Sequence, residues 1–312
     1  YSSSLHMYVA VSYTNKGFWY SRDGRFWIQS DSVTTGNGGT VYWDETLSLF
    51  IGALTGGLGV YWSTDGMTWT KSSYDGSQGN VWQFIRFQTV IIGARLGNGV
   101  IVSTDGKTWT KGTITSSSAI NDIIVSDDNS ICVASGDKGM YYLTDSTKEW
   151  TKVSGIDSSC LKIAYNGKKF YSINNSKLIM SSDGITWSTV DTVLPIAANE
   201  IATNDEVLII GVSGGSSTGI YYSIDEGLTW NKSDFPSSST NELFGYIKEY
   251  GKFYTSTLHS TSVADGNNTY WSTNGKDWFP IFTLIDQISL SENVKIISTQ
   301  AEDITTEDVI GY

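Results

Sequence analysis

Hydrophobic and polar residues alternate over short runs along nearly the whole chain. The segments Thr40-Val41-Tyr42-Trp43 and Val60-Tyr61-Trp62-Ser63 are typical. Alternation with a period of two places successive side chains on opposite faces of a strand. No stretch keeps an apolar face at helical spacing for long, and the chain has 18 tyrosines and 12 tryptophans but only 3 prolines. The pattern predicts an all-β protein.

A tight turn between two such runs recurs seven times. Its clearest form is Ser63-Thr64-Asp65-Gly66-Met67-Thr68-Trp69. Glycine accepts a positive φ there, and aspartate bonds backbone N–H groups of the turn. The copies end at Trp27, Trp69, Trp109, Trp150, Trp187, Trp230 and Trp278, in steps of 42, 40, 41, 37, 43 and 48 residues. A period near forty indicates a solenoid, an array or a propeller.

Each period contains four strand signals, which in the second period cover 40–43, 47–52, 60–63 and 68–71. The first period lacks the first of these, because the chain opens on the run 8–11. We expect Asp286–Leu290 to supply the missing inner strand and close a ring, with the strand-like run Val294–Thr299 left over. A linear β-solenoid is the alternative, but it needs no such strand. The prediction is one seven-bladed β-propeller over residues 1–300, followed by an acidic tail or linker over 301–312.

The repeated turn resembles the Asp-box, or BNR, repeat. Residues 223–230 match its Ser-x-Asp-x-Gly-x-Thr-Trp pattern fully, and four copies use a shorter Asp-Gly-x-x-Trp form. The copy at Asp145 lacks the glycine, and Asn274 replaces the aspartate in the last copy. We expect structural roles for Asp23, Asp65, Asp105, Asp145, Asp183, Asp225 and Asn274 and for the seven tryptophans named above. Seven repeated ligand or calcium sites are the alternative.

The net charge of the chain argues against some classes of binding partner. A net charge of −12 repels phosphate backbones and anionic lipid, so we expect no nucleic-acid binding. No apolar run approaches the roughly 20 residues needed to cross a bilayer, so we expect no membrane insertion. The chain begins at Tyr1 without a leader, which indicates a removed leader or a piece of a longer chain. Cys132 and Cys160 lie in apolar runs and are expected to be buried thiols rather than a disulfide.

Residues suited to catalysis are few. Asp-box propellers are familiar from sialidases, and that resemblance implies an arginine triad with a Tyr/Glu pair. The chain has only Arg22, Arg25, Arg86 and Arg95, and the first two lie on an outer turn. The carboxylate pairs Asp44-Glu45 and Asp127-Asp128 fall on turns, where we expect them to be solvated. His6 and His259 show no metal spacing. We therefore predict no catalytic residues, no metal and no cofactor.

One set of polar residues remains as a candidate site. In a propeller, the starts of the inner strands and the neighbouring loops gather at one mouth of the axial channel. The predicted ligand-binding residues there are Asn80, Asn121, Asp122, Asn199, Glu200, Asn241, Glu242 and, on the long loop 258–268, His259. They can bond sugar hydroxyls, hold a cation, or merely hydrate the channel. Trp43, Trp82, Phe84 and Tyr246 lie on inner strands, as sugar platforms or as core.

The resemblance also extends to short Asp-box repeats of bacteriophage tail or receptor-binding proteins and of bacterial surface or secreted proteins. It implies a non-catalytic recognition or platform module at an extracellular, virion or cell surface. The implied partners are a host-surface glycan or protein receptor and other subunits of a larger assembly. The competing hypotheses are a sialidase-like glycoside hydrolase and a structural spacer.

Overall fold

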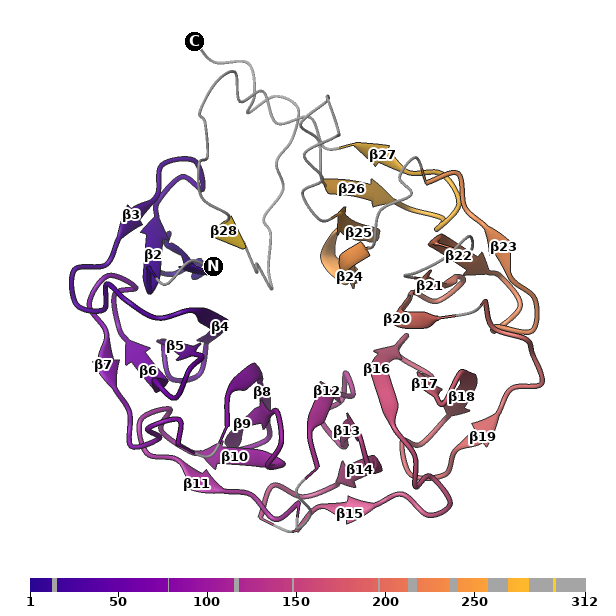
Figure 1. Cartoon of the computed structure of the whole chain (residues 1–312), viewed down its shortest axis with the longest axis horizontal. Coiled ribbons are helices and arrows are strands. Elements are labelled where there is room, and N and C mark those ends of the chain that lie inside the picture. The colour runs from indigo at the N-terminus through magenta and orange to yellow at the C-terminus, as the bar shows by residue number, and fades with distance from the viewer. Residues whose placement is uncertain are drawn as a thin grey trace.

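Four-stranded antiparallel sheets stand around a common axis like the blades of a propeller (Figure 1). The computed structural model describes residues 1–12, 16–77, 79–114, 118–147, 149–195, 197–212, 218–235, 241–257, 269–280 and 294–295. Within these residues there are seven such sheets. The predicted all-β propeller fold with seven blades is therefore confirmed.

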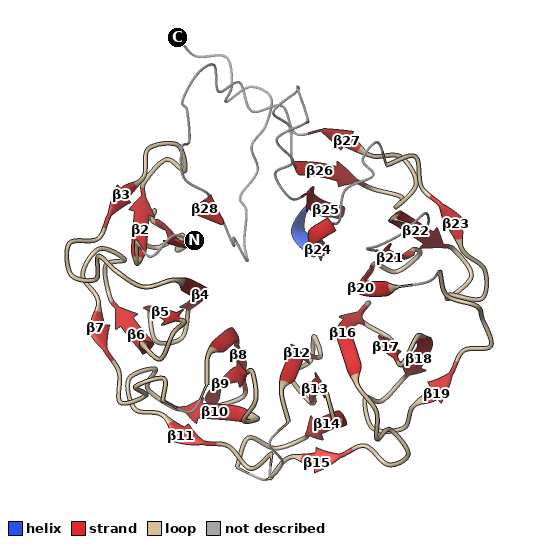
Figure 2. Cartoon of the chain, viewed as in Figure 1, coloured by secondary structure: helices blue, strands red, loops and turns tan. Residues whose placement is uncertain are grey.

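Each blade runs from an inner to an outer strand, and the blades follow one another along the chain. Blades 1 to 3 comprise β28 (Val294–Lys295), β1 (Tyr8–Ser12), β2 (Phe18–Ser21), β3 (Ile28–Gln29); β4 (Gly38–Asp44), β5 (Leu49–Leu54), β6 (Gly59–Ser63), β7 (Thr70–Lys71); and β8 (Val81–Phe87), β9 (Val90–Arg95), β10 (Val100–Ser103), β11 (Thr110–Lys111). Blades 4 and 5 comprise β12 (Ile120–Val125), β13 (Cys132–Gly136), β14 (Gly139–Leu143), β15 (Thr151–Lys152); and β16 (Cys160–Tyr165), β17 (Phe170–Asn174), β18 (Lys177–Ser181), β19 (Ser188–Thr189). Blades 6 and 7 comprise β20 (Ala198–Thr203), β21 (Leu208–Val212), β22 (Gly219–Ser223), β23 (Asn231–Lys232); and β24 (Asn241–Ile247), β25 (Lys252–Thr257), β26 (Thr269–Ser272), β27 (Phe279–Pro280), with the 3-10 turn η2 (Lys248–Tyr250) between β24 and β25 (Figure 2).

A strand from the C-terminal part of the chain completes blade 1, as predicted, but it is not the segment that we expected. β28 pairs antiparallel with β1, so that Val294 lies opposite Ser12 and Lys295 opposite Val11. The expected segment, Asp286–Leu290, lies outside the described residues, as does the tail 301–312. The inner strand of blade 1 therefore comes from the run that the sequence analysis left over.

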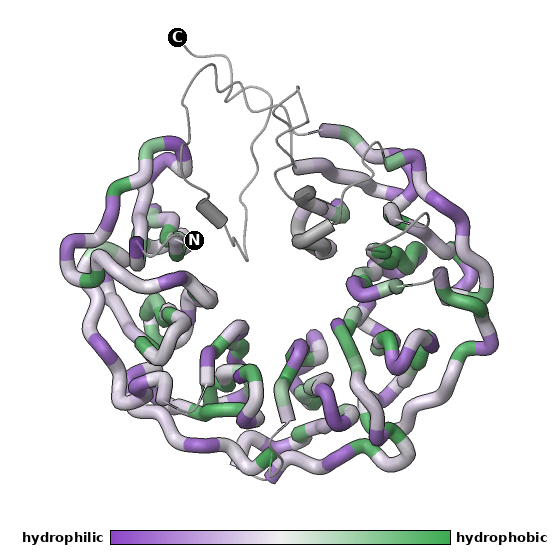
Figure 3. Tube along the Cα trace, viewed as in Figure 1, coloured by the Kyte–Doolittle hydropathy of each residue, from purple (hydrophilic) through white to green (hydrophobic). Residues whose placement is uncertain are grey.

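The hydrophobic core lies between neighbouring blades. Every residue of β5 is buried, and Figure 3 shows hydrophobic positions on the middle strands of the blades. The ring of Phe18 in blade 1 stacks on Trp69 of blade 2, with centroids 3.8 Å apart and planes 10° apart. Gly52 lies directly beneath this pair, and a Cβ atom there would approach the Phe18 ring to 2.3 Å. The small residue at position 52 thus makes room for an aromatic residue of the preceding blade.

Candidate functional site

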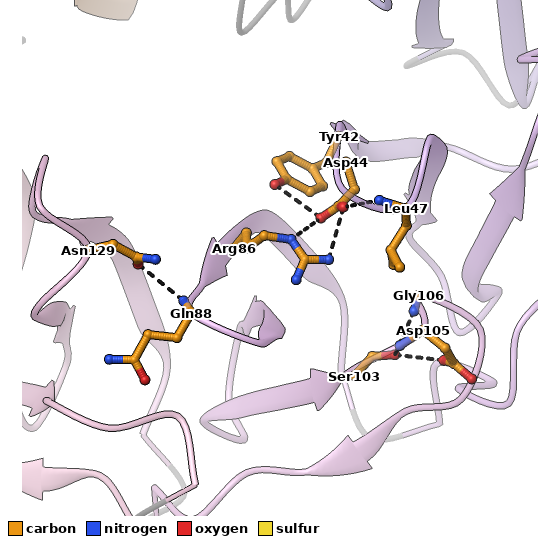
Figure 4. Close-up of polar contacts among 9 residues, drawn as sticks. All are labelled: Tyr42, Asp44, Leu47, Arg86, Gln88, Ser103, Asp105, Gly106 and Asn129. Carbon is orange, nitrogen blue, oxygen red and sulfur yellow. Dashed lines mark hydrogen bonds and ion pairs between the residues drawn. The ribbon is translucent and has the colours of Figure 1, made fainter.

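The aspartates of the repeated turns are committed to the turns themselves. In blade 2, Oδ1 of Asp65 accepts the N–H groups of Met67 at 2.8 Å and Thr68 at 2.7 Å. Oγ of Ser63 donates to the same Oδ1 at 2.9 Å and accepts the N–H of Gly66. Figure 4 shows the equivalent Ser103, Asp105 and Gly106 of blade 3. These carboxylates satisfy turn donors rather than a ligand.

The same hydrogen bonds favour the charged form of the aspartates. The N–H groups of Phe26 and Arg25 lower the pKa of Asp23. The hydroxyls of Thr229 and Ser223 lower the pKa of Asp225 to about 2. A carboxylate that accepts several donors loses them on protonation, so the charged form is the one that holds the turn.

The closing tryptophans fall into two groups. In five copies the indole N–H donates to the carbonyl of the turn glycine, at 3.0 to 3.3 Å: Trp27, Trp69, Trp109, Trp187 and Trp278. The indole nitrogens of Trp150 and Trp230 are buried without a hydrogen-bond partner. Their two turns also depart from the common pattern, because both are one residue longer and the first also lacks the glycine.

The inner strands share a feature that the sequence did not indicate. The pairing of each inner strand from β4 to β24 shifts by one residue near the strand's start, at a β-bulge. The residues that follow the bulge occupy equivalent places around the axis. We call five of them, which come from blades 2 to 6, the inner ring: Thr40, Gln83, Asp122, Lys162 and Glu200.

Two members of the inner ring bind the backbone of the next blade. The amide of Gln83 donates to the carbonyl of Ile123 at 2.9 Å and accepts its N–H at 3.1 Å. The buried carboxylate of Asp122 accepts the N–H of Ile163 at 2.9 Å through Oδ2 and that of Ile123 through Oδ1. These side chains therefore fix the spacing of blades 3, 4 and 5.

Lys162 lies between two carboxylates of the ring. The negative charge of Asp122 raises the pKa of Lys162, burial acts against this, and Glu200 adds a further raising contribution. Raising the pKa of an amine means that its charged form is favoured. The sequence analysis missed Gln83 and Lys162, because it selected the first polar residues of each strand and not the residues that follow the bulge.

The other predicted site residues have different places. Oδ1 of Asn80 accepts the N–H of Gly56 in the preceding blade at 3.2 Å, and the amide of Asn121 donates to the carbonyl of Cys160 at 2.7 Å. Asn199 lies in the bulge of β20, next to Glu200. The backbone of Asn241 and Glu242 begins β24, but their side chains lie outside the described part of the chain, as does the whole of His259.

The inner-strand aromatic residues differ in exposure. Trp43 and Phe84 are buried and belong to the core between blades. Trp82, in contrast, is the bulge residue of β8 and directly precedes Gln83 of the inner ring. Its side chain is 43% exposed. Tyr246 of β24 is half-buried and contacts Phe253.

Asp44 is not solvated, contrary to the sequence-based expectation. Its carboxylate is fully buried and receives Nε and Nη2 of Arg86 at 2.7 and 2.9 Å (Figure 4). The backbone N–H of Leu47 also donates to it. Blade 3 thus supplies the partner for a turn of blade 2. In the other pair, Asp127 is exposed and receives Nζ of Lys248 at 2.6 Å.

The cysteines and the remaining arginine are part of the interior. Cys132 and Cys160 are buried free thiols, and burial raises the pKa of Cys160 to about 11. The guanidinium of the buried Arg95 donates to the carbonyl groups of Asn98 and Val100. In the described ranges, no helix has the length and hydropathy needed to cross a bilayer. The same ranges contain no group of three His, Cys, Asp or Glu side chains suited to a metal ion.

No protein-family model and no curated protein sequence matches the chain. Solved structures are similar to it. The GH74 xyloglucanase of Xanthomonas campestris superposes with a TM-score of 0.59 at 12% identity, over 92% of this chain and 51% of that one. A streptogramin B lyase superposes with a TM-score of 0.60 at 11% identity, over 78% of this chain and 84% of that one. YCF48 from Cyanidioschyzon merolae superposes with a TM-score of 0.56 at 14% identity, over 80% of this chain and 92% of that one.

The structural similarity covers only part of the GH74 enzymes. The chain spans 39% of the length of an ancestral GH74 enzyme and about half of the Xanthomonas enzyme. At identities of 11 to 14%, these structures establish the β-propeller fold of the chain and nothing about its activity.

Proposed function

We propose that this propeller is a non-catalytic recognition module, which binds a glycan or a protein at the end of the ring where the inner strands begin. The observation that carries the proposal is the exposed indole of Trp82 directly before the inner-ring residue Gln83. Aromatic faces bind the C–H faces of sugars, while amides and carboxylates bond the hydroxyls. Besides Gln83 and Asp122, which bind backbone groups, the inner ring includes the ammonium group of Lys162 and the carboxylate of Glu200 on blades 5 and 6.

The bonding of the inner ring supports binding rather than turnover. Asp122 already accepts two backbone N–H groups, and Lys162 lies between the carboxylates of Asp122 and Glu200. A general acid needs a carboxyl group whose pKa is raised and which is free to reach the substrate. Asp122 is instead held in place by the backbone N–H groups of Ile123 and Ile163.

The proposed setting is an extracellular, virion or cell surface, with a host-surface glycan or protein as the ligand. The support is the likeness of the repeated turns to the Asp-box, together with the net charge of −12. A glycoside hydrolase is the second candidate, because GH74 enzymes share the fold and because Asp122 and Glu200 occupy equivalent positions on blades 4 and 6. The spacer hypothesis predicts no ligand.

A glycan array read with the purified protein tests the proposal. We expect the wild type to bind a defined set of glycans without releasing reducing sugar, and Trp82→Ala to weaken this binding about tenfold or more. Phe279→Ala is the matched control, because that ring is exposed to a similar degree on the outer strand β27.

Two results would overturn this account. If the wild type binds no glycan and no surface protein, the spacer hypothesis stands instead. If it releases reducing sugar and Asp122→Asn or Glu200→Gln abolishes the release, the protein is a glycoside hydrolase. Equal losses of binding from Trp82→Ala and Phe279→Ala would remove the inner ring as the site.

A further inference from the structure

The outer turn of blade 1 exposes an aromatic residue where the other blades have polar ones. Phe26 directly precedes Trp27 and is 71% exposed, and Ile28 of β3 is 56% exposed. The residues at the position of Phe26 in the other six copies are Thr68, Thr108, Glu149, Thr186, Thr229 and Asp277. Since six turns form without an apolar residue here, the fold does not require Phe26. An exposed apolar group of this kind indicates a contact outside the blade.

Two of the four arginines of the chain flank this residue. Arg22 and Arg25 are both exposed on the same turn, whereas Arg86 pairs with Asp44 and Arg95 is buried. Asp23 between them is occupied by the N–H groups of the turn. We call the exposed group the blade 1 knob: Arg22, Arg25, Phe26 and Ile28. Its chemistry fits an apolar pocket edged by carboxylates.

Blade 6 has such a pocket on the perimeter of the ring. The pocket has a volume of about 450 Å³ and lies between the connection that follows β19 and the outer turn of blade 6. Val193 and Leu228 in its lining are 90% and 56% exposed, and Pro195 and Trp230 add further apolar surface. A pocket of this kind accepts an aromatic side chain as an anchor.

Local departures from the repeat create this pocket. The turn of blade 6 is one residue longer than the common form, and Glu226 and Gly227 both adopt positive φ, 59° and 88°. Trp230 does not make the indole hydrogen bond that five other copies make. The connection from blade 5 contains Pro195, which is one of only 3 prolines in the chain.

Carboxylates edge the pocket. The exposed Asp191 directly precedes the pocket residue Thr192. Asp225 and Glu226 precede Leu228 on the same turn, and the Glu226 side chain is exposed, with Lys169 at 2.7 Å. The pocket therefore combines apolar side chains and some polar surface with an acidic edge, which is the complement of the blade 1 knob.

We propose that the knob of one copy of this protein docks into the blade 6 pocket of a second copy. Phe26 enters the pocket, while Arg22 and Arg25 face Asp191 and Glu226, since the carboxylate of Asp225 is occupied by Ser223 and Thr229. Knob and pocket lie on different blades of the perimeter, near β3 and β23 (Figure 1). The contact is thus head-to-tail, so a pair of copies keeps one free knob and one free pocket, and further copies add to form a ring or a chain. This interface is separate from the inner ring.

Sedimentation velocity over a range of protein concentrations tests the proposal. The wild type is expected to self-associate. Phe26→Thr, which restores the residue found in four other copies, and Leu228→Lys, which places in the pocket a positive charge that repels the two arginines, are each expected to weaken self-association about tenfold or more. Circular dichroism confirms that each variant is folded.

Mixing the two variants gives the sharpest result. Phe26→Thr keeps an intact pocket and Leu228→Lys keeps an intact knob, so an equimolar mixture is expected to form a heterodimer that grows no further. Thr108→Ala and Lys111→Glu on blade 3 serve as controls and are expected to leave self-association unchanged. A wild type that stays monomeric at every concentration, or a mixture without heterodimer, would overturn the proposal. So would controls that weaken self-association as strongly as Phe26→Thr.

Discussion

At the scale of single residues, polar side chains that lie far apart in sequence hold neighbouring blades together. Arg86 reaches Asp44 across 42 positions, one period of the repeat, and the N–H of Gln88 donates to Oδ1 of Asn129 in the next blade (Figure 4). The residues next to Asp44 in the sequence include no partner for its carboxylate, so the sequence predicted that this carboxylate is solvated. The partner lies one period away, where the sequence pattern gives no register.

We predict that Arg86→Ala lowers the free energy of unfolding by about 3 kcal/mol, because it leaves the buried carboxylate of Asp44 without its cation. Urea unfolding followed by tryptophan fluorescence measures the change. The control Lys111→Ala, an exposed residue of β11, is expected to change the free energy by less than about 0.5 kcal/mol. Equal effects of the two substitutions would show that the ion pair contributes nothing specific.

At the scale of strands, alternation predicted the strands but not their irregularities. The outer strands are only two residues long, as in β7, where the sequence predicted 68–71. The alternation of hydrophobic and polar residues does not reveal the β-bulges that define the inner ring. For this reason the sequence predicted Asp122 and Glu200 as site residues but not Gln83 and Lys162. The sequence also indicated no partner for Gly52 of β5, where a Cβ atom would meet the Phe18 ring of the preceding blade.

Gly52→Ala is expected to lower the free energy of unfolding by about 1–3 kcal/mol, because the new methyl group would overlap the Phe18 ring. Gly245→Ala on β24 provides the comparison, since nothing lies within 4 Å of a Cβ atom there. Thermal denaturation of the two variants is the measurement. A Gly52→Ala protein as stable as Gly245→Ala would contradict the close packing of blades 1 and 2.

At the scale of the whole molecule, the period near forty was enough to predict the ring. Two strand-like runs near the end of the chain, 286–290 and 294–299, both suited the missing strand, and composition alone did not distinguish them. The structure pairs Val294 with Ser12. The identity of this segment matters because an unpaired β1 would leave an open edge at the seam of the ring.

A disulfide between positions 12 and 294 tests this closed ring most directly. In the double variant Ser12→Cys, Val294→Cys, the two residues lie opposite each other on adjacent strands, within the range that a disulfide spans. Mass spectrometry of the oxidised, digested protein is expected to show the linked peptides, with native circular dichroism. A link that forms instead in Ser12→Cys, Gln287→Cys, or in neither variant, would contradict the account.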